Sequence, residues 1–131
     1  MPAIRTRSWG WSWLPLLSGN ADPSGNLQLT SDAVEVGHQW RFDRLTVLSD
    51  TTSGGRCLVY RGSLTASRFI DGTSTAAYDE WESPTPYFLE GGDQLVFLFS
   101  GLSPGAQASA RIHREDLEIV ALGVDPTFKD W

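Results

Sequence analysis

Residues 86–114 read PYFLEGGDQLVFLFSGLSPGAQASARIHR, and this stretch decides the fold class. Its centre, residues 95–99, is apolar at every position, which is the pattern of a central strand buried on both faces. Residues 106–112 alternate between small apolar and polar side chains, the pattern of a half-buried strand. Turn residues at 91–93 and 103–105 separate these segments from each other and from the strand candidate before them. We therefore expect three antiparallel strands in a meander that contributes to one core.

The rest of the chain is also made of short strand-like segments. Trp40 and Phe42 share one parity whereas Leu45 and Val47 share the other, which predicts a bulge near Asp43. No segment has a convincing helical period, and 71–85 reads as a long loop or a weak edge strand. The strand candidates outside the opening stretch are residues 27–29, 32–37, 38–49, 56–62, 66–70 and 117–122. Together they predict an all-β fold, a single antiparallel β-sandwich of seven to nine strands that is jelly-roll-like.

Length and composition indicate one domain with two different ends. The chain has 131 residues and a net charge of −6, whereas residues 1–20 hold two arginines and no acidic residue. We expect a Trp-rich N-terminal arm over 1–20, the sandwich over 21–123 and a short tail over 124–131. The acidic body disfavours nucleic acid as a partner, and the lack of a long apolar run disfavours a membrane. Cys57, the single cysteine, is expected to be buried and unreactive.

The arm carries three tryptophans at a spacing of two. An extended backbone would place Trp9, Trp11 and Trp13 on one side. Three interpretations are open: the tryptophans close over the domain's own core, dock on a partner subunit, or stack on sugar rings. Docking on a partner is an interpretation because aromatic rows beside basic residues are typical interface anchors. The predicted partner-binding residues are Arg5, Arg7, Trp9, Trp11, Trp13, Phe128 and Trp131.

The sequence holds little that resembles a reaction centre. His38 and His113 are far apart and lack the His-x-His spacing of metal-binding jelly rolls, so we predict no metal site. The acidic groups at 79–82 and 115–116 are expected to be solvated rather than catalytic. No nucleophile elbow, phosphate loop or dinucleotide fingerprint occurs in the chain. We therefore expect a protein that is not an enzyme and needs no cofactor.

Four motifs carry a resemblance to a known group of proteins. They are a Val-Tyr-Arg-Gly turn at 59–62, an Asp-Gly-Thr loop at 71–73, a Pro-plus-apolar strand over 86–93, and a Gly-x-x-Pro-Gly-Ala-x-Ala hairpin at 101–108. In these the chain resembles small β-sandwich virion proteins of tailed phages of actinobacteria. The resemblance implies a non-enzymatic capsid decoration or minor capsid protein, or a neck or tail component. It also implies binding to the major capsid protein or other virion subunits, a homo-oligomer, and a place in the virion after assembly in the host cytoplasm.

A second interpretation is a carbohydrate-binding β-sandwich module. In that case exposed aromatic side chains would stack on sugar rings, either in the Trp row or at Tyr78 and Trp81. The two interpretations merge if the domain is a receptor binder carried on a phage tail.

Overall fold

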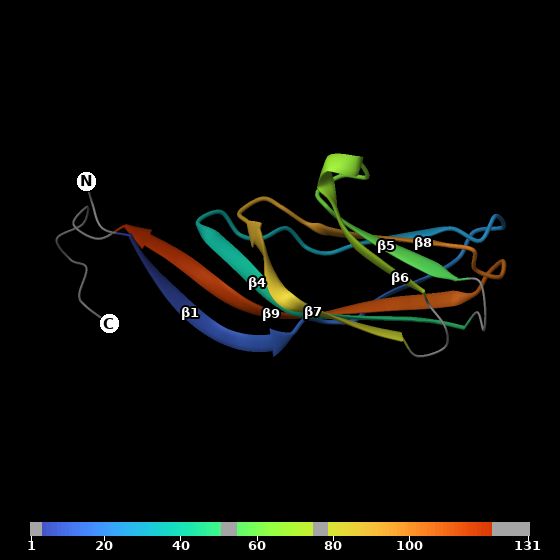
Figure 1. The fold of residues 1–131 in the computed structure, drawn as a ribbon, viewed down its shortest axis with the longest axis horizontal. Helices are drawn as coiled ribbons and strands as arrows, with labels where there is room; N and C mark the ends of the chain where they lie inside the picture. The colour runs from blue at the N-terminus through green and yellow to red at the C-terminus, as the bar shows by residue number, and fades with distance from the viewer. Residues whose placement is uncertain (1–3, 51–54, 75–78, 122–131) are drawn as a thin grey trace.

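The protein is all-β and consists of two antiparallel sheets, one above the other in Figure 1. A computed structural model describes residues 4–50, 55–74 and 79–121. The first sheet contains β1 (Ile4–Trp13), β2 (Leu17–Asn20), β4 (His38–Ser49), β7 (Asp79–Glu90) and β9 (Gln107–Ala121). The second contains β3 (Leu27–Thr30), β5 (Arg56–Arg61), β6 (Phe69–Ser74) and β8 (Leu95–Ser100). A short 3-10 helix, Ala66–Arg68, precedes β6, and the predicted all-β, sandwich-like fold is confirmed.

The core lies between the two sheets and takes side chains from both. Phe97 and Phe99 on β8 and Phe42 on β4 are fully buried, and the small inner residues of β9 belong to the same cluster. Strand β8 lies inside the second sheet, between β3 and β5. The prediction of a central strand over 95–99 is therefore confirmed, because an interior strand with neighbours on both edges is the one that can bury residues of both parities.

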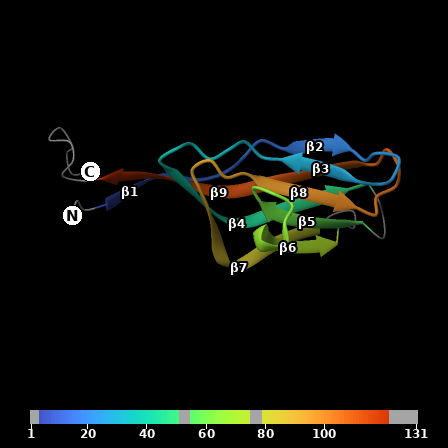
Figure 2. The same ribbon diagram turned by 90° about the horizontal axis from the view of Figure 1, so that it is seen from above.

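The first sheet has the order β1-β9-β4-β7, with β2 also paired to β9. Strands β1 and β2 follow one edge of β9 in turn, β1 along residues 113–121 and β2 along residues 107–110. Between them the Leu14 amide donates to the Ile112 carbonyl at 2.8 Å. The residues expected to form an arm thus run as an edge of the sheet, and the paired ends of β1 and β9 extend beyond the body as a two-stranded ribbon (Figures 1 and 2).

The predicted meander is wrong, because β7 and β9 belong to the first sheet and β8 to the second. Turn residues mark where each of these strands ends, but they do not determine the strand with which the next one pairs. The segments 106–112 and 117–122, predicted as separate strands, belong to the single strand β9, which begins at Gln107 and extends to Ala121. The predicted strand at 32–37 is a loop, tied by hydrogen bonds of Val34 to the backbone of Gly92 and Asp93.

Other local predictions agree better with the structure. The pairing of β4 shifts between Phe42 and Arg44 against both of its neighbours, so the predicted bulge at Asp43 is confirmed. Residues 71–85 contain the end of β6 and the beginning of β7, and both are edge strands of their sheets. In β7 the backbone of Trp81 pairs with Leu45. The side-chain predictions for Tyr78, Phe128 and Trp131, and the predicted tail over 124–131, lie outside the described residues.

Candidate functional site

A bulge in β1 divides the three tryptophans between the two faces of the sheet. Ser8 pairs with Leu117 and Trp11 with Glu115, so Trp9 and Gly10 together lie opposite Asp116. Gly10 adopts φ 86, a backbone conformation that glycine allows most easily. Because alternation restarts after the bulge, Ser8, Trp11 and Trp13 share a face. The prediction that all three indoles lie on one side is therefore wrong.

The outer face of the first sheet carries a continuous line of stacked rings and cations. The imidazole of His113 lies 5.3 Å from the Trp11 ring and 5.0 Å from the Trp13 ring, between centroids. The Arg41 guanidinium lies over Trp11 at 5.0 Å and the Arg111 guanidinium over Trp13 at 4.8 Å. These five side chains come from β1, β4 and β9, and we refer to them as the outer ladder.

Hydrogen bonds and ion pairs fix the outer ladder to the sheet. His113 Nδ1 lies 3.0 Å from Oδ1 of Asp43, the bulged residue of β4. Arg41 forms an ion pair with Glu115 at 3.3 Å, and the Ser8 hydroxyl donates to the same carboxylate at 2.7 Å. These contacts hold the side chains of His113 and Arg41 to neighbouring strands. A partner would therefore remove less side-chain conformational entropy on binding.

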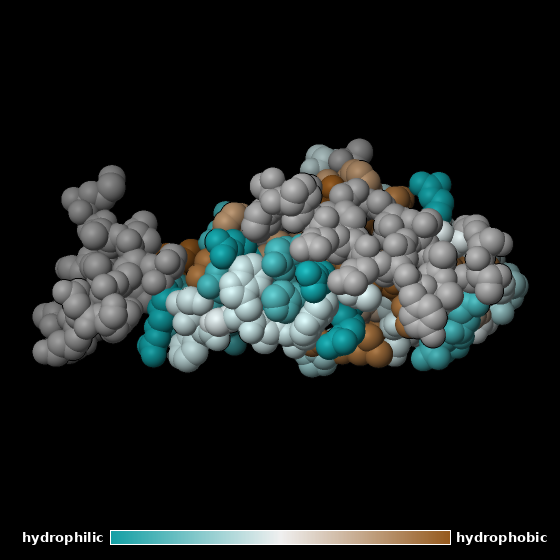
Figure 3. Space-filling view, turned by 60° about the horizontal axis from the view of Figure 1, so that its bottom comes forward, coloured by the Kyte–Doolittle hydropathy of each residue, from teal (hydrophilic) through white to brown (hydrophobic). Residues whose placement is uncertain are grey.

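The tryptophans stay exposed despite these contacts. Trp9 is 57% exposed, Trp11 36% and Trp13 37%, and Arg7 lies over the Trp9 ring at 4.6 Å on the other face. None of the three belongs to the buried core cluster. On the lower side of Figure 1, which Figure 3 brings forward, pale and teal side chains predominate over brown ones. The coloured part of this surface is therefore not broadly aliphatic. Of the other predicted partner-binding residues, Arg5 pairs through its backbone with Val120.

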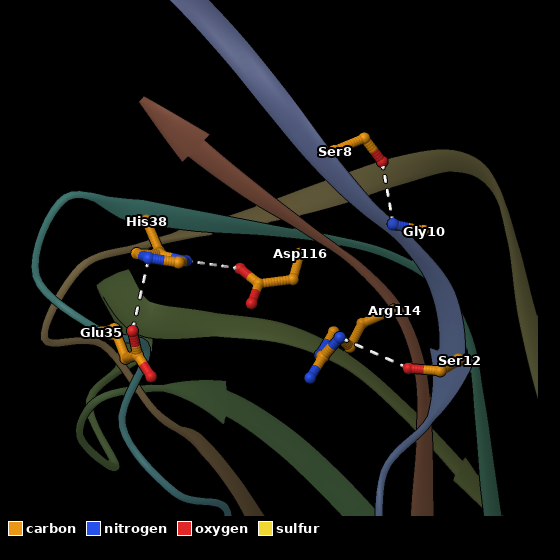
Figure 4. A network of polar contacts seen from close by, with 7 residues as sticks. All are labelled: Ser8, Gly10, Ser12, Glu35, His38, Arg114 and Asp116. Atoms are coloured by element: carbon orange, nitrogen blue, oxygen red, sulfur yellow. Dashed lines mark hydrogen bonds and ion pairs between the residues drawn. The ribbon is translucent and has the colours of Figure 1, made fainter. Parts of the chain in front are cut away.

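A second feature, a cavity of about 240 Å³, lies on the inner side of the same sheet. The Arg114 guanidinium lies over the Trp40 ring at 5.3 Å, and its NH1 group is 3.4 Å from the Ser12 hydroxyl (Figure 4). The cavity is bounded by β2, β4, β9 and the segments that connect β1 to β2 and β3 to β4, through Leu14, Pro15, Leu17, Ser31, Asp32, Ala33, Glu35, Trp40, Ile112, Arg114 and Asp116.

His38 connects the loop beside this cavity to the sheet. Its Nδ1 lies 2.9 Å from Asp116 Oδ1 and its Nε2 lies 3.3 Å from Glu35 Oε2 (Figure 4). The hydrogen bond to Asp116 raises the pKa of His38 above its ordinary value of 6.5, against the opposing effect of burial. The charges of Asp116, Glu35 and Glu118 add to the upward shift. The protonated imidazole therefore holds two carboxylates that would otherwise repel each other.

The remaining chemical candidates are separated by the fold. His38 pairs with Glu118 and His113 lies on the alternate parity of β9, so the two histidines lie on opposite faces. Glu115 and Asp116 are separated in the same way. Within residues 4–50, 55–74 and 79–121, no cluster of three or more metal-ligating side chains forms. The Cys57 thiol is fully buried, and desolvation raises its pKa to about 12, so little of the reactive thiolate forms at neutral pH.

Sequence reasoning missed the cavity and both histidine–aspartate pairs. The partners are 78 residues apart for His38 and 70 for His113. No local spacing signals such a contact, because the register of β4 against β9 brings the partners together. The one available signal is the run of charged residues at 113–118, which is unusual inside a strand with buried neighbours.

Comparison of the chain with protein-family models, curated proteins and solved structures gives no significant match. In the described part of the chain, no helix has the length and apolar character needed to cross a membrane.

Proposed function

We propose that this protein is a non-enzymatic structural subunit of a tailed-phage virion, a capsid decoration or minor capsid protein, and that it docks on neighbouring subunits through the outer ladder and the edge of β1. The observation that carries this proposal is the exposure of Trp11 and Trp13 at a sheet edge while arginines and His113 hold them in place. Tryptophan and arginine are the residues most enriched among side chains that dominate binding energy at protein interfaces.

The strand edge adds a second reason to propose docking. Strand β1 ends the order of its sheet, and no described strand pairs with its outer side. Unpaired edges readily accept another chain, and proteins commonly restrict this with a bulge. The bulge at Gly10 divides the edge into two short parts, which favours docking through side chains over continuous strand addition.

The strand order supports a jelly roll, the architecture we propose for the sandwich. Taken as β2 to β9, the eight strands form one sheet of order 2-9-4-7 and another of order 3-8-5-6. Every connection crosses between the sheets except that from β5 to β6, which pair with each other. Two four-stranded sheets connected by repeated crossing are expected of a jelly roll, a fold used widely in viral shells. A phage setting and a homo-oligomer are what the sequence resemblance adds.

Sugar stacking on the tryptophan row is less well supported. A stacking platform must offer a bare ring face, whereas the rings of Trp11 and Trp13 each already carry two groups. The described residues favour a protein partner for this face.

Co-sedimentation with phage particles assembled without this chain tests the docking proposal. Wild-type protein should sediment with the particles, whereas the double variant Trp11→Ala/Trp13→Ala should stay in the supernatant with unchanged unfolding, because both rings lie outside the core. Phe69→Ala is the matched control, since Phe69 is an aromatic residue 47% exposed on an edge strand of the other sheet. Equal sedimentation of wild type and double variant, or unfolding of the double variant, contradicts the proposal.

A further inference from the structure

The inner cavity, on the opposite face of the first sheet from the outer ladder, has the size of a small ligand. Its volume of about 240 Å³ corresponds to about eight water molecules at roughly 30 Å³ each. Pockets for drug-sized ligands begin at about 300 Å³, so this one suits a single ring. One wall is apolar, formed by Leu14, Pro15 and Leu17.

Arg114 brings unused hydrogen-bond donors to the cavity. A guanidinium has five N–H donors, and the hydrogen bond made by this one is the 3.4 Å contact with Ser12. Its Nε has no partner, and no carboxylate of a described residue forms an ion pair with it. Stacking on Trp40 holds the planar group in place without using its N–H edge.

The carboxylates supply unused acceptors next to these donors. Asp32 is exposed at the cavity and its carboxylate makes no hydrogen bond within the described residues. Asp116 is bonded to His38 through Oδ1, and a carboxylate has further lone pairs available on its second oxygen. The cavity therefore offers donors and acceptors together beside an apolar wall.

We propose that this cavity binds a neutral polyol of one ring, such as a single sugar unit. A hydroxyl both donates and accepts, so adjacent hydroxyls can bond Arg114 and a carboxylate at the same time. The C–H face of the ring packs on Leu14 and Pro15. A carboxylate ligand meets Asp32, Glu35 and Asp116, so an anionic ring binds more weakly than the neutral ring.

Titration of the full chain with sugars, followed by ¹⁵N NMR, tests this site. The probes are glucose, galactose, mannose and N-acetylglucosamine, with glucuronate as the anionic analogue. We expect saturable shifts of the Trp40 indole N–H and the Arg114 Nε–H with at least one neutral sugar, and binding of glucuronate about tenfold weaker, a difference of about 1.4 kcal/mol.

Two variants assign the binding to the cavity. Asp32→Asn replaces one acceptor oxygen by an amide donor and removes the negative charge at an exposed side chain that makes no internal bond, so the protein stays folded, and sugar affinity should fall about tenfold. Arg114→Lys keeps the charge but loses the planar donor edge, and should weaken binding as well. Glu90→Gln, an equal loss of charge at an exposed residue outside the cavity, should bind as wild type does.

Three outcomes would overturn the proposal. The first is no saturable shift with any neutral sugar up to about 50 mM, where a site with a millimolar Kd is filled. The second is tighter binding of glucuronate than of the neutral sugars. The third is wild-type affinity in both Asp32→Asn and Arg114→Lys. None of these affects the docking proposal, whose variants lie on the opposite face of the sheet.

Discussion

The two halves of strand β9 share one backbone and one pairing scheme but have opposite surroundings. In the first half, the inner residues Ala108, Ala110 and Ile112 are 1% exposed each and belong to the core. In the second half, Ile119 is 43% exposed and charged residues predominate. Both halves are hydrogen-bonded to neighbouring strands. Two differences contribute: Ile119 has the parity of His113 and lies on the outer face of the sheet, and the second sheet covers the body but does not extend over the ribbon (Figures 1 and 2).

This contrast separates folding from recognition within a single strand. The aromatic core lies between the two sheets and does not include the exposed indoles of β1, so this edge strand can carry them at little cost to the free energy of unfolding. Exposed aromatic groups beside a sheet edge serve a partner better than they serve the fold.

The largest effect on stability is expected when an isoleucine is replaced by alanine in the first half of β9, compared with the same replacement in its second half. Ile112→Ala should lower the free energy of unfolding by about 2–5 kcal/mol, since it deletes a fully buried side chain. Ile119→Ala should change it by less than about 0.5 kcal/mol, because Ile119 is largely solvated. Urea unfolding measures both. Equal losses would show that the ribbon is as tightly packed as the body, and the comparison would fail.

Glycines with positive φ give a second, smaller contrast. Gly25 in the body has φ 80, and a Cβ there would lie 2.2 Å from the Leu102 carbonyl oxygen, so Gly25→Ala combines strain with a clash. Gly10 in the edge strand β1 has φ 86 with nothing within 4 Å, so Gly10→Ala carries the conformational cost alone, about 1–2 kcal/mol. Thermal unfolding should therefore rank Gly25→Ala as the more damaging. The reverse order would mean that the β1 bulge supports the body.

The smallest effect is a pH dependence at the junction of body and ribbon. Because its folded-state pKa is raised, His38 stabilises the protein fully below about 6.5, and this contribution is lost as pH rises through the folded-state pKa. In Asp116→Asn the strongest cause of the shift is removed, so this variant should lose stability chiefly at low pH and show a flatter profile. Unfolding across pH 5–8 provides the measurement. A wild-type profile without any fall in this range attributable to His38 contradicts the assignment.

The core strands could be predicted from the sequence more easily than the edge strand β1. The apolar run at 95–99 and the parity change at Asp43 predicted β8 and the β4 bulge, since burial leaves a direct mark on residue type. The bulge at Gly10 produces no such pattern in the sequence, because Trp9 and Trp11 on its two sides are both exposed, one on each face of the sheet.

The strand pairing was the other feature that could not be predicted from the sequence. Local turn signals favoured a meander, yet β7, β8 and β9 alternate between sheets, because the choice of pairing strand depends on the whole set of strands. The cavity depends on that choice too: Arg114 and Trp40 meet because β9 lies beside β4, and nothing in their separate surroundings in the sequence indicates it.

The central claim is that the outer ladder faces a neighbouring subunit, and a photo-crosslinker tests it most directly. The benzophenone amino acid would replace Trp13 in one variant and Phe69 in the other, each carried into assembled particles. We predict that crosslinking from position 13 joins this chain to another polypeptide of the particle while position 69 gives little adduct. No intermolecular adduct from position 13, or as much from position 69, would contradict the account.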